Sequence, residues 1–129
     1  MHCLDTNIII DFLRGNEQII KKVNDLSNNI EIFVTPITVC EIYKGIFLHN
    51  KIEEELEIFE KMLHQLNNIE FNNDVCKEFG KIYSQLKKAG TLIPEFDMMI
   101  ASFVKVNNLT LITRDKKHFE DVGIKVEVW

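Results

Sequence analysis

Hydrophobic residues along the chain follow two patterns, short apolar runs and longer segments with an apolar residue every three or four positions. The short runs predict buried strands at residues 2–4, 30–34, 69–71, 109–113 and 124–128. The longer segments predict helices at residues 8–14, 17–26, 36–48, 51–66, 74–89 and 94–106, with a turn or short helix at 115–119. Strands that alternate with helices predict an α/β fold, in which helices cover both faces of a mostly parallel sheet of four or five strands.

Residues that commonly begin or end helices stand at several of these boundaries. Thr35 suits an N-cap, and Pro36 suits the first helical position, where its missing N–H is not needed. Gly15 and Gly90 directly follow predicted helices, where glycine often ends them. No internal repeat, linker or low-complexity tract interrupts the pattern, and 129 residues suit one folded unit. We therefore predict a single domain over residues 1–129.

Composition narrows the class of protein. The net charge of -5 argues against a passive nucleic-acid coat, but it allows an enzyme whose acids are neutralised locally by metal. No apolar run approaches the roughly 20 residues of a membrane span, and Asp5 and Asp11 interrupt the first apolar stretch, which argues against a signal peptide. The three cysteines, Cys3, Cys40 and Cys76, lack CxxC spacing and are interpreted as reduced, buried, small hydrophobes. These observations predict a cytoplasmic protein without a membrane segment.

Four acidic residues are predicted to meet at one edge of the sheet. Asp5 follows the first strand and Asp115 follows the fourth, so both leave the carboxyl end of a strand. Glu41 lies on the flank of the helix after the second strand, beside its apolar stripe, and Asp97 stands near the start of the last long helix. Open α/β sheets bind their ligands at this carboxyl edge. We therefore predict a pocket of carboxylates that is anchored by Asp5.

Each acid also has a purely structural interpretation. Asp5 could cap the following helix, Asp97 could interact with a helix dipole, and Asp115 could form a turn after its strand. Glu41 could be a solvent-facing helix residue that pairs with Lys44. The occurrence of all four acids at one edge of one predicted sheet favours the pocket over four separate structural roles.

A pocket of crowded carboxylates implies a bound cation. Clustered carboxylates repel one another and favour protonation unless positive charge lies among them. Oxygen ligands select hard cations such as Mg²⁺ or Mn²⁺, which polarise phosphoryl oxygens and lower the pKa of bound water. The sequence contains no Walker A, GxGxxG or HExxH motif, and its histidines, His2, His49, His64 and His118, have no metal-binding spacing. Hydrolysis of a phosphodiester is the reaction that these features favour.

Four segments give the chain a wider resemblance. MHCLDTNIIIDFLRG, TPITVCEIYKG, IPEFDMMIAS and LITRDKKHF occur in the order found in PIN-domain ribonucleases. The set is similar to the VapC-type toxins of bacterial toxin–antitoxin pairs, and the similarity extends over essentially the whole chain. It implies a PIN-like three-layer α/β/α sandwich and a metal-dependent endoribonuclease that hydrolyses RNA phosphodiesters with metal-activated water.

The resemblance assigns roles to the four acids as the expected catalytic residues. Asp5 and Asp97 match the acids that hold the principal metal, Mg²⁺ or Mn²⁺, most directly. Glu41 and Asp115 match acids that complete its shell, partly through water or a second ion. The position matched by Asp115 varies within the family, so this assignment rests on the weakest of the four motifs.

Neighbouring polar residues are expected to support the acids. Thr6, Asn7 and Thr113 match polar positions that hold water or orient carboxylates, although Asn7 could instead complete a helix cap. Lys116 and Lys117, together with the adjacent His118, follow Asp115 directly, and we expect this basic cluster to contact RNA phosphates near the mouth of the pocket. The alternative for these two lysines is an ordinary solvated position at a helix end.

The resemblance also implies partners. VapC-like toxins are held by a VapB-like antitoxin whose tail lies across the site, and they tend to form homodimers. The charged helix at 51–66 has an apolar stripe, which offers a groove to a partner or packs against the chain's own sheet. We expect an RNA substrate, a VapB-like antitoxin and a homodimer.

Two other classes with acidic pockets are alternatives. Haloacid-dehalogenase-like phosphatases also place an Asp after the first strand, but they need a second Asp where Asn7 stands. Phosphoacceptor receiver domains cluster acids at the same edge, but they need an acidic pair at the first strand and a phosphorylated Asp after the third, where Asp74 is only weakly placed. Labelling with acetyl phosphate distinguishes a receiver domain, which keeps the phosphate, from a nuclease.

Overall fold

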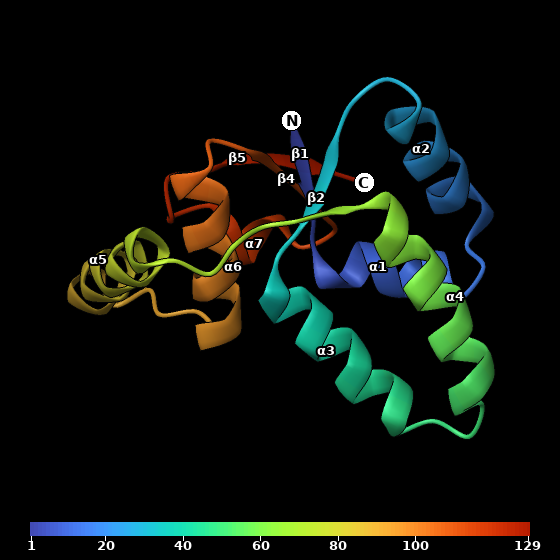
Figure 1. Cartoon of the computed structure of the whole chain (residues 1–129). Helices are drawn as coiled ribbons and strands as arrows, with labels where there is room; N and C mark the ends of the chain where they lie inside the picture. Colours follow the sequence, from blue (N-terminus) through green and yellow to red (C-terminus); the bar gives the residue numbers. More distant parts are fainter.

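The computed structural model describes residues 1–129 as a five-stranded sheet with seven helices packed around it (Figure 1). The strands are β1 (His2–Leu4), β2 (Ile32–Val34), β3 (Asn67–Asn68), β4 (Thr110–Thr113) and β5 (Lys125–Val128). The helices are α1 (Thr6–Leu13), α2 (Glu17–Ser27), α3 (Pro36–Phe47), α4 (Ile52–Gln65), α5 (Asn73–Ala89), α6 (Glu95–Val106) and α7 (Lys116–Phe119).

The sheet is parallel throughout and is ordered β3-β2-β1-β4-β5. In its centre, β1 pairs with β2 on one side and with β4 on the other. All five carboxyl ends therefore lie at the same edge. The strand order reverses between β1 and β4, and parallel α/β sheets bind ligands at such a switch point. The expected parallel sheet of four or five strands is confirmed, with five strands.

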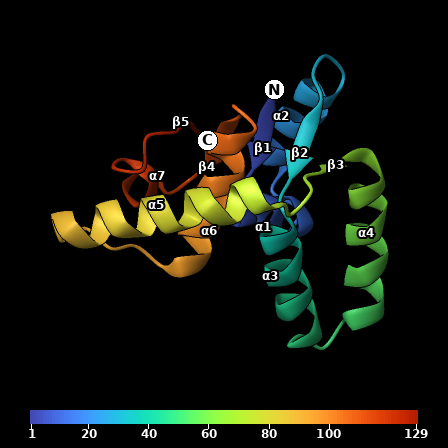
Figure 2. The ribbon, with the colours of Figure 1, turned by 60° about the vertical axis from the view of Figure 1, so that its left-hand side comes forward.

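Helices cover both faces of the sheet and form two separate hydrophobic clusters. Cys3 and Leu111 face the cluster under α5 and α6, whereas Leu4 and Ile112 face the cluster under α1 to α4. Neighbouring residues of a strand point to opposite faces, which explains this division. Figures 1 and 2 show α5 and α6 on one side of the strands and α3 and α4 on the other. The predicted three-layer α/β/α arrangement is confirmed.

Local capping determines where the helices begin and end. Thr35 accepts a hydrogen bond from the Thr38 N–H at 3.1 Å, and Pro36 takes the first position of α3, as predicted. Gly90 ends α5 with a φ of 73°, a left-handed conformation that suits glycine. Several other helix ends differ from the predicted ranges by one residue, and the largest difference is that α1 begins at Thr6 rather than at residue 8, directly after its N-cap Asp5.

The strand predicted at residues 69–71 is wrong by two positions. The pairing residues are the polar Asn67 and Asn68, which join the edge of the sheet beside β2. The backbone N–H of Ile69 still donates to the Val34 carbonyl, but Phe71 leaves the ladder and packs edge-on against Phe103, with ring centroids 5.0 Å apart. Ile69 and Phe71 are apolar because they pack against other parts of the chain, and not because they belong to a strand. The apolar pattern therefore placed the strand two residues too late.

The interpretation of the cysteines holds for one of three. Cys3 is fully buried in β1, where burial, with a smaller contribution from neighbouring Asp5, raises the pKa of its thiol far above the usual value. Cys40 on α3 and Cys76 on α5 are exposed, which corrects the prediction that both are buried. All three are free thiols. No helix has the length and apolar character that a membrane crossing requires.

The helix α4 packs on the chain itself. Phe59, Met62 and the following Leu66 are buried in the cluster under α1 to α4, and Leu56 and Leu63 pack against it. The ring of Phe59 meets Tyr43 of α3 edge-on, with centroids 5.1 Å apart. The apolar stripe predicted for residues 51–66 therefore belongs mainly to the core, as the second of its two interpretations expected.

Candidate active site

One pocket at the carboxyl edge of the sheet contains all four predicted acids. The pocket has a volume of about 230 Å³ and is lined by Asp5, Thr6, Asn7, Ile10, Glu41, Asp97, Asp115 and His118. These side chains come from the residue after β1, from α1, α3, α6 and α7, and from the second residue after β4. Segments more than 100 residues apart in sequence thus meet at the place where the strand order predicted a ligand site.

Asp5 is the deepest of the acids, with 5% of its surface exposed. One carboxylate oxygen accepts from the Thr6 N–H at 2.8 Å, and the other accepts from the Thr113 hydroxyl at 2.7 Å. The pKa of Asp5 is raised to about 6, chiefly by burial and to a smaller extent by the nearby Asp97 and Glu41 carboxylates, while the bonds from Thr113 and Thr6 oppose the rise. Asp5 therefore caps α1 and also contributes a carboxylate to the pocket.

Thr113 and Asn7 hold the region behind Asp5. The fully buried Thr113 hydroxyl donates to Asp5 and accepts from the Asn7 side-chain amide at 3.2 Å and from the Asp115 N–H at 3.0 Å. The amide oxygen of Asn7 accepts from the Arg114 N–H at 3.3 Å. Asn7 therefore joins α1 to the end of β4, and it does not serve as a helix cap.

Glu41 is oriented by a hydroxyl group. One of its oxygens accepts from the Thr6 hydroxyl at 2.7 Å, and this hydroxyl lies 3.3 Å from that of Thr38. The half-buried Glu41 thus faces α1 across the pocket. Its structural alternative, a solvent-facing position paired with Lys44, does not describe this arrangement.

Asp97 and Asp115 meet at an imidazole. His118 Nδ1 lies 2.7 Å from Asp97 Oδ2, in a hydrogen bond, and 3.1 Å from Asp115 Oδ2, as an ion-pair contact. Burial raises the pKa of Asp97, and the hydrogen bond and charge of His118 counteract this rise. The sequence interpretation placed His118 in a basic cluster near the mouth of the pocket and did not predict its contact with the acids, although its position three residues after Asp115 on one helical turn was a usable signal.

A second residue missed from sequence is Asp11. It is 8% exposed on α1, and its carboxylate lies 3.1 Å from the Arg114 guanidinium. This pair ties α1 to the segment between β4 and Asp115. Lys116 and Lys117 are exposed on α7 and do not line the pocket, so the structure places them beside the acids and not among them.

The chemistry of the pocket fits a hard divalent cation, although the side chains do not form a closed cage for one. Four carboxylates supply the oxygen ligands that Mg²⁺ and Mn²⁺ prefer. The desolvated Asp5, whose pKa is raised by burial and by neighbouring acids, gains from a nearby positive charge. No three acidic, histidine or cysteine side chains converge as a ready metal site.

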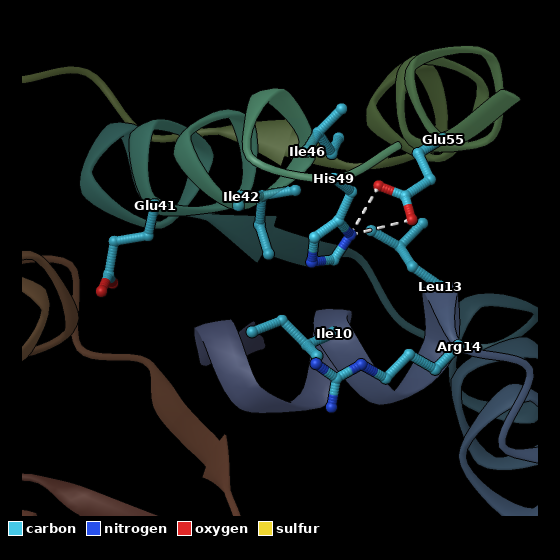
Figure 3. Close-up of a pocket in the computed structure, with 9 residues that line it drawn as sticks. Ile10, Leu13, Arg14, Glu41, Ile42, Ile46, His49 and Glu55 are labelled. Carbon is cyan, nitrogen blue, oxygen red and sulfur yellow. Dashed lines mark hydrogen bonds and ion pairs between the residues drawn. The ribbon is translucent and has the colours of Figure 1, made fainter. Parts of the chain in front are cut away.

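An apolar cleft of about 110 Å³ adjoins the acid pocket. Its floor is formed by Ile10 and Leu13 of α1 and by Ile42 and Ile46 of α3. Figure 3 shows Glu41 at one end of this cleft and the His49–Glu55 pair toward the other end. Arg14 lies on the α1 side of the cleft, near Ile10 and Leu13. Ile10 and Glu41 line both hollows, so the cleft and the acid pocket are neighbours that meet at these two side chains.

Comparisons with known proteins agree with this geometry. Ribonuclease VapC1 of Haemophilus influenzae strain R2866 is 32% identical over 123 residues, which cover 95% of this chain and 92% of that protein. The crystal structure of VapBC2 from Rickettsia felis, bound to a DNA fragment from its promoter, superposes with a TM-score of 0.93 at 25% identity, covering 99% of this chain and 98% of that one. VapBC-1 from nontypeable H. influenzae gives 0.88 at 31% identity, covering 99% and 97%.

The family assignment follows from the extent of the match. The PIN domain family matches residues 2–125, which include β1 to β4, the first residue of β5 and every residue that lines the acid pocket. The resemblance noted from four short segments therefore extends through the fold and the whole pocket. The chain belongs to the PIN domain family.

Proposed function

We propose that this chain is a divalent-metal-dependent endoribonuclease and the toxin of a toxin–antitoxin pair. The observation that carries the proposal is the meeting of Asp5, Glu41, Asp97 and Asp115 in one pocket. Membership of the PIN domain family and similarity over 95% of the chain to a ribonuclease named VapC1 support it. Mg²⁺ or Mn²⁺ is the proposed ion, because the pocket offers oxygen ligands.

In the proposed mechanism, the four acids bind the cation and the chain supplies no covalent nucleophile. Asp5 and Asp97 would hold the ion most directly, and Glu41 and Asp115 would complete its surroundings. When bound, a divalent cation lowers the pKa of water and stabilises charge on the phosphate. Thr113 and the Thr6 N–H fix the Asp5 carboxylate, and the Thr6 hydroxyl fixes Glu41. Water adds across one P–O bond, which yields a phosphomonoester and a free hydroxyl.

Substitution of Asp5 tests the proposal. Asp5→Asn keeps the size of the side chain and removes its charge, and we expect RNA cleavage to fall by more than about 100-fold, beyond the loss typical of an outer-shell partner. Asp25→Asn on the exposed face of α2 makes the same chemical change far from the pocket and serves as the control. Cleavage by Asp5→Asn at the wild-type rate, with EDTA-sensitive wild-type activity as reference, would overturn the mechanism.

The proposed antitoxin has a plausible place to bind. The apolar cleft between α1 and α3 leads directly to Glu41, so a VapB-like tail that fills it would also cover the acid pocket. Placing a charge on the cleft floor at the half-buried Leu13, with Leu13→Glu, is expected to weaken co-purification with the antitoxin, and thermal melting verifies that the variant is folded. An undiminished complex contradicts this placement.

A homodimer is also proposed, and light scattering of the purified chain tests it.

Lys116 and Lys117 are proposed as RNA phosphate contacts. Both are exposed on α7, next to the acid Asp115, where they can meet a backbone that enters the pocket. Because each released counterion contributes to the salt dependence of binding, the Lys116→Ala, Lys117→Ala double variant should show a shallower salt dependence of RNA cleavage. An unchanged salt dependence removes this role.

The two alternative classes have no supporting observation. Asn7 stands where a dehalogenase-like phosphatase needs its second Asp, and its amide is bonded to Thr113. Asp74 lies in the exposed first turn of α5 and does not line the acid pocket, so it is not placed as a receiver phosphoacceptor. The nuclease is therefore the one function that we propose.

A further inference from the structure

His118 is the one side chain in the acid pocket that can offer a ring nitrogen. It lies on α7, a helix of four residues, and 43% of its side chain is exposed. Its Nδ1 is 2.7 Å from Asp97 Oδ2 and 3.1 Å from Asp115 Oδ2. The histidine therefore contacts two acids that come from separate elements, α6 and the segment after β4.

The direction of the hydrogen bond follows from the chemistry of the partners. Ionised carboxylates only accept hydrogen bonds, so Nδ1 carries the hydrogen and donates it to Asp97. The bond uses Oδ2 of Asp97, and no donor of the chain bonds to Oδ1. Asp97 therefore keeps one oxygen for another ligand while its second oxygen is held.

The acids differ in how many donors hold them. Asp5 is held by a backbone N–H and by the Thr113 hydroxyl, and Glu41 is held by the Thr6 hydroxyl. The carboxylate of Asp97 has a single donor, and this donor is His118. The orientation of the Asp97 carboxylate therefore depends on the His118 imidazole and on no other side chain of the pocket. Without the imidazole, no hydrogen bond fixes the rotation of this carboxylate.

We propose that His118 is a positioning residue for the metal site, whose Nδ1–H fixes the orientation of Asp97 so that its other oxygen can bind the ion. This inference rests on the proposed metal site, and it adds a residue that holds no metal itself. Donors behind metal-binding side chains commonly contribute 10–100-fold to metal affinity. The same nitrogen keeps Asp115 close to Asp97, so that the two acids from different elements stay on one side of the pocket.

An isosteric pair of variants tests the role. Asn and Leu have almost the same shape, but only Asn carries a δ-nitrogen that can donate at the place of histidine Nδ1. We expect His118→Leu to weaken Mn²⁺ binding about 10-fold or more, and His118→Asn to stay within about three-fold of wild type. Mn²⁺ binding is measured by calorimetry without RNA. His64→Leu, at an exposed histidine of α4, is the control.

Each outcome of this experiment is decisive. Wild-type affinity in His118→Leu, or equal weakening in the Asn and Leu variants, overturns the positioning role. Thermal melting of each variant verifies that it is folded, and rescue by Asn is a result that a general structural defect does not produce. Asp5→Asn is measured alongside. If Asp5→Asn binds Mn²⁺ like wild type, the ion lies elsewhere, and the proposed metal site fails, and the inference with it.

Cleavage activity gives a second readout. If His118 orients Asp97 without touching the RNA, saturating Mn²⁺ should restore most of the cleavage rate of His118→Leu, because the ligands themselves remain. Asp5→Asn should stay inactive at the same Mn²⁺ concentration, because it lacks a ligand. A His118→Leu rate that stays low at saturating Mn²⁺ overturns a role limited to positioning.

Discussion

The acid pocket has two halves, each with a carboxylate, that are held by different groups and differ in burial. In the deep half, Asp5 and Thr113 are 5% and 0% exposed, and Asn7 ties them to α1. In the open half, the side chains of Asp115 and His118 are 41% and 43% exposed and stand on or beside the four-residue α7. The strand ends thus hold one half firmly, while a short helix at the surface holds the other.

This difference has an electrostatic consequence. A carboxylate that is removed from water is costly to ionise, which is why the pKa of Asp5 rises to about 6. The open half keeps more water and adds the partly exposed imidazole of His118, so the charge there is screened. The deep half therefore gains most from a bound cation, and the open half can adjust as the cation and the RNA enter.

The largest stability effect should come from the deep half. Thr113→Val removes the hydroxyl that donates to Asp5 and accepts from Asn7 and Asp115, and it leaves buried polar groups without partners. We expect a loss of about 2 kcal/mol in the free energy of unfolding, measured by urea denaturation. Thr110→Val, on the same strand, is the control and should change stability by less than about 0.5 kcal/mol. An equal loss of unfolding free energy in the two variants would show that the Thr113 hydrogen bonds add no stability to the deep half.

The stability of the metal-free chain should depend on pH through Asp5. The folded-state pKa of about 6 lies above the value of about 4 in an unfolded chain, so the folded state binds this proton more tightly. The contribution is fully present below about pH 4 and is lost as pH rises through 6. Between about pH 7.5 and pH 5, wild type should gain about 1 kcal/mol more than Asp5→Asn. Parallel pH profiles for the two proteins contradict the raised pKa.

The smallest effect should come from the open half. Asp115→Asn removes a charge whose side chain is 41% exposed and whose contact with His118 is 3.1 Å long. Exposed ion pairs contribute little, so we expect the unfolding free energy to change by less than about 0.5 kcal/mol. A loss above about 1 kcal/mol in the same urea assay would make the two halves alike.

The parts of the fold that depend on local chemistry were predictable from sequence. Thr35, Pro36 and Gly90 are found at the helix ends that their conformational preferences indicate. The parallel sheet followed from the alternation of strands and helices. Asp5 and Asp115 reach the same edge because each follows a parallel strand, which is a property of the topology and not of any pair of residues.

The features that sequence reasoning missed depend on contacts between distant segments. The approach of His118 to Asp97 requires α7 to lie against α6, which no local pattern encodes. Asn67 and Asn68 form a strand because they lie beside β2, although both are polar. Cys40 and Cys76 were predicted to be buried because cysteine is usually buried in proteins. Both are exposed, because they stand on helical faces that point away from the core.

The position of β1 in the middle of the sheet also governs when the pocket can exist. The strand His2–Leu4 pairs with residues 110–112, so one of its two neighbours in the sheet is synthesised more than 100 residues after it. Thr113, Asp115 and His118 emerge later still. A nascent chain therefore has no assembled acid pocket until residues 110–118 have been synthesised, and a chain that stops before them lacks part of the site.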